Sequence, residues 1–180
     1  MTETSCKTYR RRMIRIIALA FALLALPLAP AAAGEDAPLR SIPGVEKPYE
    51  TTAFDPAADA MALVDTALAA ARQSGKRVLL VMGSNDCHDS AWFANAIAGI
   101  DIAGALMTRY HIIFVDIGAP RVGQGRNLEV ARRFGFKNIR GTPTVAILDA
   151  RGHVLNRKAA PKWRNAASRS PDEIQAELMQ

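Results

Sequence analysis

The stretch GSNDCHDSAWF, residues 83–93, places a cysteine where it could do chemistry. Cys87 is the only cysteine after residue 6, and it lies between the apolar run VLLVM and a helix-compatible stretch. Backbone amides at a helix start are unpaired and carry partial positive charge, which stabilises a thiolate. The alternative is a small, inert, buried cysteine. Position alone therefore leaves a nucleophilic and a structural interpretation open.

The polar neighbours of Cys87 act in opposite directions. His88 could add a cation and Ser90 a hydroxyl donor, and both would favour a thiolate. Asp86 and Asp89 would disfavour it, since they bring negative charge close to the sulfur. Asp86, His88 and Asp89 are therefore candidate modulators. One thiol with distant histidines is a poor ligand set for a soft metal, so we expect neither a metal nor another cofactor.

The first 33 residues have the layout of a secretory signal peptide. Residues 1–15 contain five basic residues and one acid, the almost uncharged run IRIIALAFALLALPLAP extends from residue 14 to residue 30, and small residues follow it. This order predicts export, with cleavage near Ala33 and delivery to the bacterial periplasm. The alternative is an uncleaved membrane anchor, because the apolar run approaches the ~20 residues that a membrane helix needs.

Loss of the leader changes both the charge and the cysteine count. The full chain has 23 basic and 17 acidic residues, and residues 34–180 keep 18 and 16, a net charge of only +2. No nucleic-acid partner is implied. Cys6 leaves with the leader, so Cys87 remains alone in a compartment that favours disulfides. An unpaired cysteine there indicates a reactive thiol or a covalent dimer, and the oligomeric state stays open.

Helical and strand patterns alternate after a Pro-rich lead-in at residues 34–54. A helix is predicted from a cap at Asp55 to Gly75, with Pro56 in its first turn. The runs RVLLVM (77–82) and HIIFVDI (111–117) predict parallel strands that are buried on both faces. Residues 88–108 should form the crossover, broken near Gly99 or Gly104.

The second half of the pattern predicts a helix, a hairpin and a final helix. The helix covers residues 126–134, and the hairpin pairs 143–149 with 153–158 around the turn DARG. Ser170, Pro171 and Glu173 form a capping box for the last helix. This order predicts an α/β domain over residues 55–180, a small sheet with helices on both faces.

Two stretches resemble one known family. KRVLLVMGSNDCHDS resembles the active-site strand, loop and helix start of the thioredoxin superfamily, and IRGTPTVAILDARGHVL resembles its cis-proline loop and hairpin. The resemblance implies a thioredoxin-like fold with a mixed sheet of about four strands. It maps the first active-site cysteine onto Cys87 and the cis-proline onto Pro143. The backbone of Thr142 would then pair with an extended partner chain.

Three departures from the family pattern affect the implied chemistry. Ser90 replaces the second cysteine, Asp86 replaces the tryptophan before the first, and Val81 stands where thioredoxins bury an acid. A dithiol enzyme releases its mixed disulfide through the second cysteine. Ser90 cannot form a disulfide, so an external thiol or a second thiol on the substrate would have to resolve the intermediate.

Two hypotheses of function follow. The first is monothiol exchange with a protein or small-molecule thiol or disulfide, in which Cys87 attacks, Ser90 donates to the thiolate, and Thr142 with Pro143 holds the partner. The second is a redox-inactive binding module that recognises a partner protein around the cis-proline loop. A membrane enters either hypothesis only through an uncleaved leader.

Overall fold

The computed structural model describes residues 40–180. The expected leader and its cleavage near Ala33 lie outside the described residues, as does the beginning of the lead-in. Residues 40–54 contain turns and one isolated bridge, between Ile42 and Val45, and form neither a helix nor a strand.

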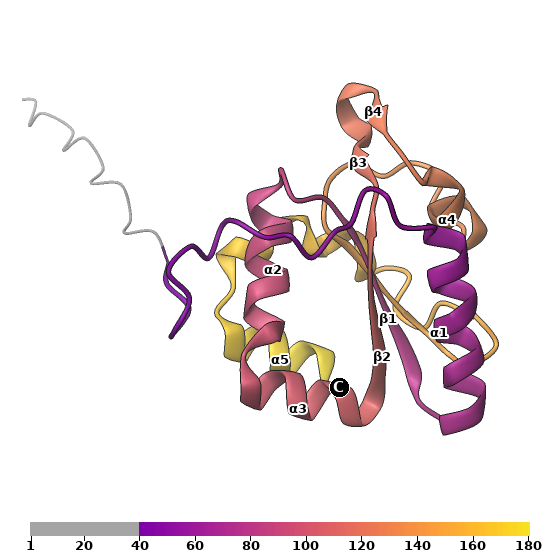
Figure 1. Cartoon of the computed structure of the whole chain (residues 1–180), viewed down its shortest axis with the longest axis horizontal. Helices are drawn as coiled ribbons and strands as arrows, with labels where there is room; N and C mark the ends of the chain where they lie inside the picture. Colours follow the sequence, from indigo (N-terminus) through magenta and orange to yellow (C-terminus); the bar gives the residue numbers. More distant parts are fainter. Residues whose placement is uncertain (1–39) are drawn as a thin grey trace, which may run out of the picture. The chain divides into compact units, whose positions relative to one another are not determined.

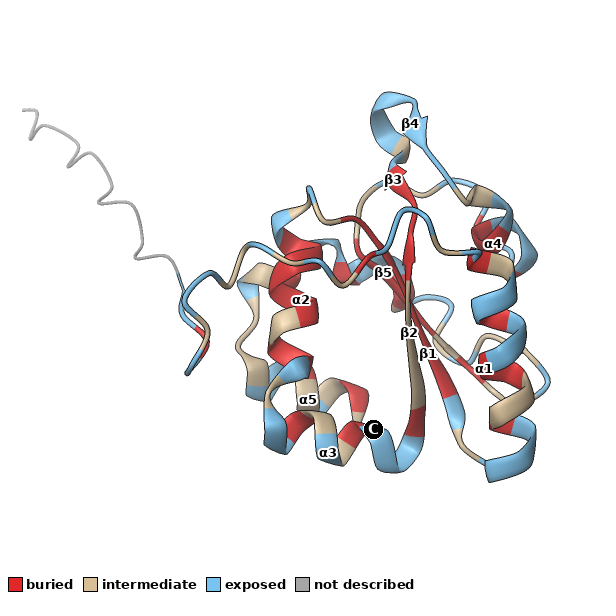
Figure 2. Ribbon diagram, in the orientation of Figure 1, coloured by how far each residue is buried: buried red, intermediate tan, exposed pale blue. Residues whose placement is uncertain are grey.

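The centre of the domain is a three-stranded sheet of order β2-β1-β5 (Figure 1). β1 (Arg77–Gly83) is parallel to β2 (Tyr110–Asp116) and antiparallel to β5 (Thr144–Leu148). Six of the seven β1 residues are buried, as Figure 2 shows for the middle of the sheet. An unbroken apolar run suits this position because both faces of a central strand are covered.

Helices cover the two faces of the sheet separately (Figures 1 and 2). α1 (Ala60–Ser74) and α4 (Leu128–Arg133) pack against the face that carries Val78, Leu80 and Met82. The other face, with Leu79 and Val81, is covered by the following elements: α2 (His88–Ala98), α3 (Ile100–Arg109), the 3₁₀ segment η2 (Ala160–Ser168) and α5 (Pro171–Leu178). The predicted helix–sheet–helix layering is confirmed.

The crossover between β1 and β2 breaks at Gly99, one of the two predicted positions. The chain bends by 86° there between α2 and α3. Within residues 40–180 no single helix is long and apolar enough to cross a membrane. α2 and α3 pass that test only when they are counted together across the bend.

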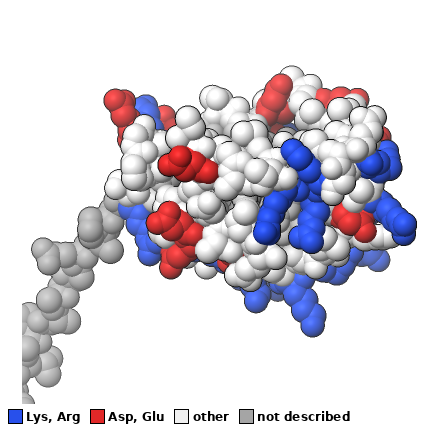
Figure 3. Space-filling view, turned by 90° about the horizontal axis from the view of Figure 1, so that it is seen from below, with Lys and Arg blue, Asp and Glu red and all other residues white. Residues whose placement is uncertain are grey.

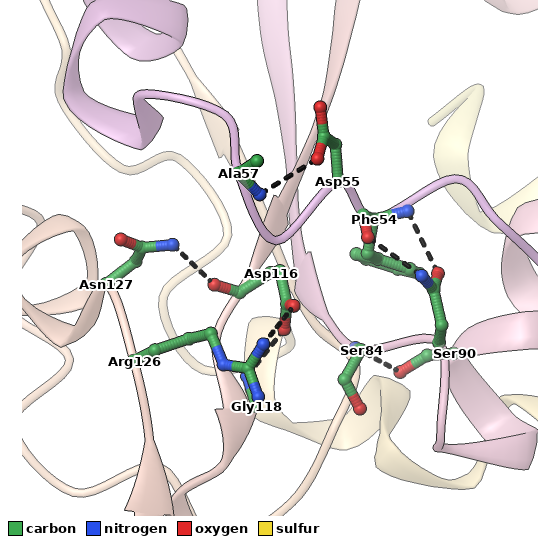
Figure 4. Close-up of polar contacts among 10 residues, drawn as sticks. Phe54, Asp55, Ala57, Ser84, Ser90, Asp116, Gly118, Arg126 and Asn127 are labelled. Atoms are coloured by element: carbon green, nitrogen blue, oxygen red, sulfur yellow. Dashed lines mark hydrogen bonds and ion pairs between the residues drawn. The ribbon is translucent and has the colours of Figure 1, made fainter.

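The start of the first helix was predicted wrongly. Helix α1 begins at Ala60, where the carboxylate of Asp59 accepts a hydrogen bond from the Ala62 amide. Asp55 instead accepts from the Ala57 amide in a preceding turn (Figure 4). Both acids have cap chemistry, and the docking of the helix onto the sheet selected the later one. Its end at Gly75 is confirmed, with the left-handed φ of 72°.

The predicted hairpin is only half formed, so the central sheet has three strands and not four. Residues 153–158 contribute an isolated bridge, Leu148 to Val154, rather than a strand. The reason is Asn156, whose side-chain oxygen accepts from the Ile147 amide while its nitrogen donates to the Val145 carbonyl. A side chain thus fills ladder positions that a further strand would have occupied.

A second, smaller pairing was not predicted. β3 (Gly118–Ala119) pairs antiparallel with β4 (Gln124–Gly125) across the 3₁₀ turn η1 (Pro120–Val122). This hairpin follows β2 and projects beyond the edge of the sheet in Figure 1. Helix α4 begins only after it, at Leu128, and is shorter than the predicted 126–134.

Candidate active site

Cys87 lies at the edge of the sheet formed by the carboxyl ends of β1 and β2 and the beginning of β5. It is the N-cap residue of α2, with extended backbone angles of φ −104° and ψ 115°. Its side chain accepts no capping hydrogen bond from the amides of the first turn of α2. The predicted helix-start position of the sulfur is present in the structure.

Cys87 contacts the segment just before β5 that contains Thr142 and Pro143, which we call the proline loop. The Cys87 Sγ–H donates to the Thr142 carbonyl oxygen at 3.2 Å, a contact between residues 55 positions apart. The Thr142–Pro143 peptide bond is cis, and Pro143 is buried while Thr142 and Cys87 are half-buried. The sulfur therefore lies against backbone polar groups, and it is not sealed beneath apolar side chains.

Ser90 has a different immediate contact from the one expected. Its side chain is fully buried, and its oxygen accepts a hydrogen bond from the Ser84 amide at 3.4 Å (Figure 4). Among the described residues no hydrogen bond joins Ser90 to Cys87. Because Ser90 accepts from the amide, its own hydroxyl proton is not consumed by that contact.

Within residues 40–180, none of the charged neighbours forms a hydrogen bond or ion pair with the Cys87 sulfur. His88 Nε2 lies 3.1 Å from the Asp89 carboxylate, on a side chain that is 69% exposed. The second oxygen of Asp89 accepts from the Ala167 amide at 2.8 Å, which fastens η2 to the start of α2. Asp86 is exposed. Asp89 is thus a structural link between two segments as well as a charge near the site.

Two contacts that were not predicted hold the loop before Cys87. The Asn85 side chain accepts from the Phe54 amide at 3.1 Å and donates to the Phe54 carbonyl at 2.8 Å. Phe54 itself is fully buried. An asparagine side chain can replace a strand neighbour in this way because it carries a donor and an acceptor. Its partner is 31 positions away, so local sequence could not identify it.

The segment before Phe54 also lies along α2. Tyr49 stacks on Trp92, with ring centroids 5.3 Å apart. The side-chain Nδ2 of Asn95 donates to the carbonyls of Pro48 and Glu50 at 3.0 and 2.9 Å. The lead-in therefore fastens the helix that carries Cys87, a role that its lack of periodicity did not indicate.

A second polar centre at the same edge is Asp116, the last residue of β2, which is 5% exposed. Its carboxylate accepts from the Gly118 amide at 2.7 Å and pairs with Arg126 at 3.1 Å (Figure 4). The Asp116 carbonyl accepts from the side chain of Asn127 at 2.8 Å. These contacts anchor the β3–β4 hairpin.

Other features of a dithiol or metal site are not found in the described part of the chain. Val81, at the position of the buried acid in thioredoxins, is fully buried in the core. Residues 40–180 contain no cluster of three or more His, Cys, Asp or Glu side chains that could hold a metal ion.

The family model described as thioredoxin-like matches residues 59–150, slightly more than half of the chain. The chain belongs to the thioredoxin-like family. The match includes Cys87, Ser90, Thr142 and Pro143, so all the predicted site residues lie inside the thioredoxin-like region. A mixed sheet with helices on both faces agrees with it, and the fold is that of thiol–disulfide oxidoreductases.

One solved structure is also similar to this protein. It is a disulphide isomerase from Xylella fastidiosa Temecula1, with 26% sequence identity and a TM-score of 0.64. The similarity covers 70% of this chain and 93% of that one. No curated protein matches the chain.

Proposed function

We propose that this protein carries out thiol–disulfide exchange through Cys87 alone. The Cys87 thiolate attacks one sulfur of a disulfide, a new S–S bond forms to Sγ, and the old S–S bond breaks. The other sulfur leaves as a thiolate and takes up a proton from water. A low-molecular-weight or protein thiolate then attacks the partner sulfur of the mixed disulfide. A new S–S bond forms to that sulfur, its bond to Sγ breaks, and Cys87 leaves as a thiolate.

The observation that carries this proposal is the contact between Cys87 Sγ and the Thr142 carbonyl at the N-cap of α2. The sulfur is half-buried, at the start of a helix whose first amides have no intrahelical acceptor, and next to a backbone that can pair with an extended chain. Thr142 and Pro143 are the residues that we assign to holding the partner.

Ser90 is assigned a supporting role. Ser90 lies three positions after Cys87, in the first turn of α2. Its oxygen accepts a hydrogen bond from the Ser84 amide, which leaves its hydroxyl proton free to be donated. It can donate to the thiolate, and it cannot displace the partner by forming a disulfide. The mixed disulfide must therefore persist until an external thiol arrives.

Proteins or small molecules with accessible disulfides are the proposed partners. A disulphide isomerase among the similar structures supports this class, since the likeness covers nearly all of that chain. A purely structural cysteine would be expected among apolar side chains. Cys87 instead contacts a backbone carbonyl across 55 positions.

The test uses the full chain with Cys6→Ser, so that Cys87 is the single thiol. Excess 2-hydroxyethyl disulfide, which is small and uncharged, should produce one adduct by intact mass. We expect the folded protein at pH 7 to react at least about tenfold faster than the same chain unfolded in urea, because the start of α2 and the proline loop fix the position of the sulfur. The adduct should last until a thiol is added, and Cys87→Ser should form none.

Equal rates in the folded and unfolded chains would contradict the proposal. Such a result would favour the second function, a binding module that uses the same surface without exchange. The fully buried Val81 is the observation on its side, because no acid is present there to move protons. In that case Cys87→Ser would leave partner affinity unchanged.

Export to the bacterial periplasm is part of the proposal. It is supported by the order of basic, apolar and small residues over positions 1–33. Sequencing the N-terminus of protein recovered from a periplasmic extract should find Gly34 first. Recovery of the intact chain from the membrane fraction would favour the anchor instead.

A further inference from the structure

A small hollow lies between α4, the chain that follows it and Pro120. Its volume is about 210 Å³. Its apolar and cationic lining includes Pro120, Leu128, Arg132, Phe136, Lys137 and Ile139. Sites for drug-sized ligands and cofactors run from about 300 to 1,000 Å³, so this α4 hollow has the size of a single side chain.

The α4 hollow is within reach of a peptide bound at Cys87. Ile139 precedes Thr142 by three residues, and three residues span at most about 11 Å. The Thr142 carbonyl is 3.2 Å from Cys87 Sγ. A partner chain that runs along the proline loop would therefore reach the hollow within about four residues of its own cysteine.

Positive charge is concentrated in the segment of the chain that contains the lining of the hollow and leads to Thr142. Residues 118–142 contain six basic residues and one acid, Glu129, whereas the rest of residues 34–180 contains 12 basic and 15 acidic residues. Arg126 pairs with Asp116, and Arg133 pairs with Asp65. The other four basic side chains are exposed, and none has a carboxylate partner among residues 40–180: Arg121, Arg132, Lys137 and Arg140.

A further cation lies against the proline loop from η2. A Cβ placed on Gly141 would be 3.0 Å from the Arg164 Cβ and 3.2 Å from its Cδ, so the Arg164 stem packs on the backbone just before Thr142. Arg164 is exposed and forms no ion pair with the described residues. Arg164 therefore adds an unpaired cation next to the backbone that precedes Thr142.

We propose that the α4 hollow and its cations select an acidic, extended protein segment as the exchange partner. An apolar side chain of that segment fills the hollow over Leu128 and Phe136, and carboxylates face Arg132 and Lys137. Unpaired cations around an apolar site favour opposite charge in a partner and speed its arrival. This inference rests on the exchange reaction proposed for Cys87 and specifies its substrate class.

The experiment compares three short peptides, each with one cysteine joined by a disulfide to 2-mercaptoethanol. They share leucines on both sides of the cysteine, and their other residues are glutamate, lysine or serine. At pH 7 and low salt, we expect Cys87 in the Cys6→Ser chain to react at least fivefold faster with the glutamate peptide than with the lysine peptide. About 1 M salt should remove most of the preference, since the Debye length falls to about 3 Å.

Charge reversal locates the effect. Arg132→Glu with Lys137→Glu should abolish or invert the preference. The matched control, Arg72→Glu with Arg151→Glu, makes the same change of net charge at the opposite end of the domain. Arg72, like Arg132, is an exposed residue in the last turn of a helix. Lys and Arg are also present on that end (Figure 3), so the control shows whether any positive surface suffices.

The hollow itself is tested by replacing the leucines of the glutamate peptide with glycine, which should slow its reaction several-fold. Each variant is also reacted with neutral 2-hydroxyethyl disulfide. No reaction with that probe in the unmodified chain overturns the exchange proposal. If 2-hydroxyethyl disulfide reacts normally, two results overturn only the acidic-partner inference. They are equal rates for the three peptides, and an equal loss of the preference for the glutamate peptide in the two charge-reversal variants.

Discussion

Two loops leave the same edge of the sheet, and they are held in different ways. Residues 84–87 lie between β1 and α2. Beside two local bonds, from the Ser84 amide to Ser90 and from the Cys87 amide to the Ser84 carbonyl, their side chains contact distant segments: Asn85 binds Phe54, and Cys87 binds the Thr142 carbonyl. Residues 118–127 lie between β2 and α4, and their anchor is Asp116, whose carboxylate and carbonyl bind loop residues no more than 11 positions away. Distant side-chain contacts thus hold the first loop, whereas local contacts hold the second.

Exposure follows the same division. Ser84 and Ser90 are buried around the first loop, whereas β4 and the turn before it are exposed (Figure 2). Val122, at the tip of the hairpin, is 70% exposed. A reacting sulfur needs fixed surroundings, and a recognition surface needs accessible side chains. The contrast therefore matches the division of roles that we propose, chemistry at Cys87 and partner selection along residues 118–142.

The largest effect should come from the first loop. A Cβ on Gly83 would lie 2.7 Å from the Phe54 ring and 2.7 Å from Ser90 Oγ, both fully buried. Gly83→Ala should reduce the free energy of unfolding by about 3 kcal/mol in urea melts, since neither neighbour can move freely. It should also slow adduct formation at Cys87.

Gly104→Ala is the control for that substitution. Gly104 is exposed within α3 and has open space around its Cβ position, so alanine should stabilise the protein by about 0.5–1 kcal/mol. If Gly83→Ala melts like the unsubstituted protein, the first loop is not confined as described.

The second loop should respond less. Asp116→Ala leaves the buried Gly118 amide and Arg126 without their acceptor, which should cost about 2 kcal/mol. Because the contacts are local, the rate at Cys87 with neutral 2-hydroxyethyl disulfide should stay within about twofold. Hydrogen exchange should quicken at residues 117–127.

Asp65→Ala provides the comparison for Asp116. It removes an Asp–Arg pair on the surface, where Asp65 is 62% exposed and 2.7 Å from Arg133, and should cost about 0–1 kcal/mol. A large change in the Cys87 rate for Asp116→Ala would show that the two loops are coupled and remove the distinction between them.

The smallest effect is expected outside both loops, at the capping box of α5. The pKa of Glu173 lies below its ordinary value of 4.5. The main cause is the hydrogen bond from the Ser170 backbone amide, and the second is a hydrogen bond with the Ser170 side chain. A lowered pKa in the folded state stabilises the protein above pH 4.5, and this contribution is lost as the pH falls through the folded value.

Urea midpoints of the unsubstituted chain and Glu173→Gln test this directly. The midpoint of Glu173→Gln should be slightly lower at pH 6.5, and the difference should shrink as the pH falls below 4.5, because the glutamate then becomes protonated. Asp172→Asn is the matched control, since it removes a first-turn charge without that hydrogen bond. A difference that stays constant as the pH falls would contradict the assignment.

The elements that depend on local pattern were predictable. The apolar run of β1, the helix end at Gly75 and the capping box at Ser170 all follow from residues within a few positions of one another. The place of Cys87 at a helix start was likewise visible, because strand and helix patterns meet there. Asp55 and Asp59 show the limit, since both have capping chemistry and only the docked helix distinguishes them.

Sequence alone thus determined the order of the three central strands and of most of the helices, the lone thiol after the leader region and the proline that faces it. Tertiary structure decided what these residues touch: Asn85 pairs with a backbone 31 positions away, and Ser90 turns to Ser84. Asn156 replaces a strand that the pattern predicted. The physical reason is that periodicity records which side of an element is buried. A hydrogen bond needs two groups placed to within a fraction of an ångström, and the packing of the whole chain sets that placement.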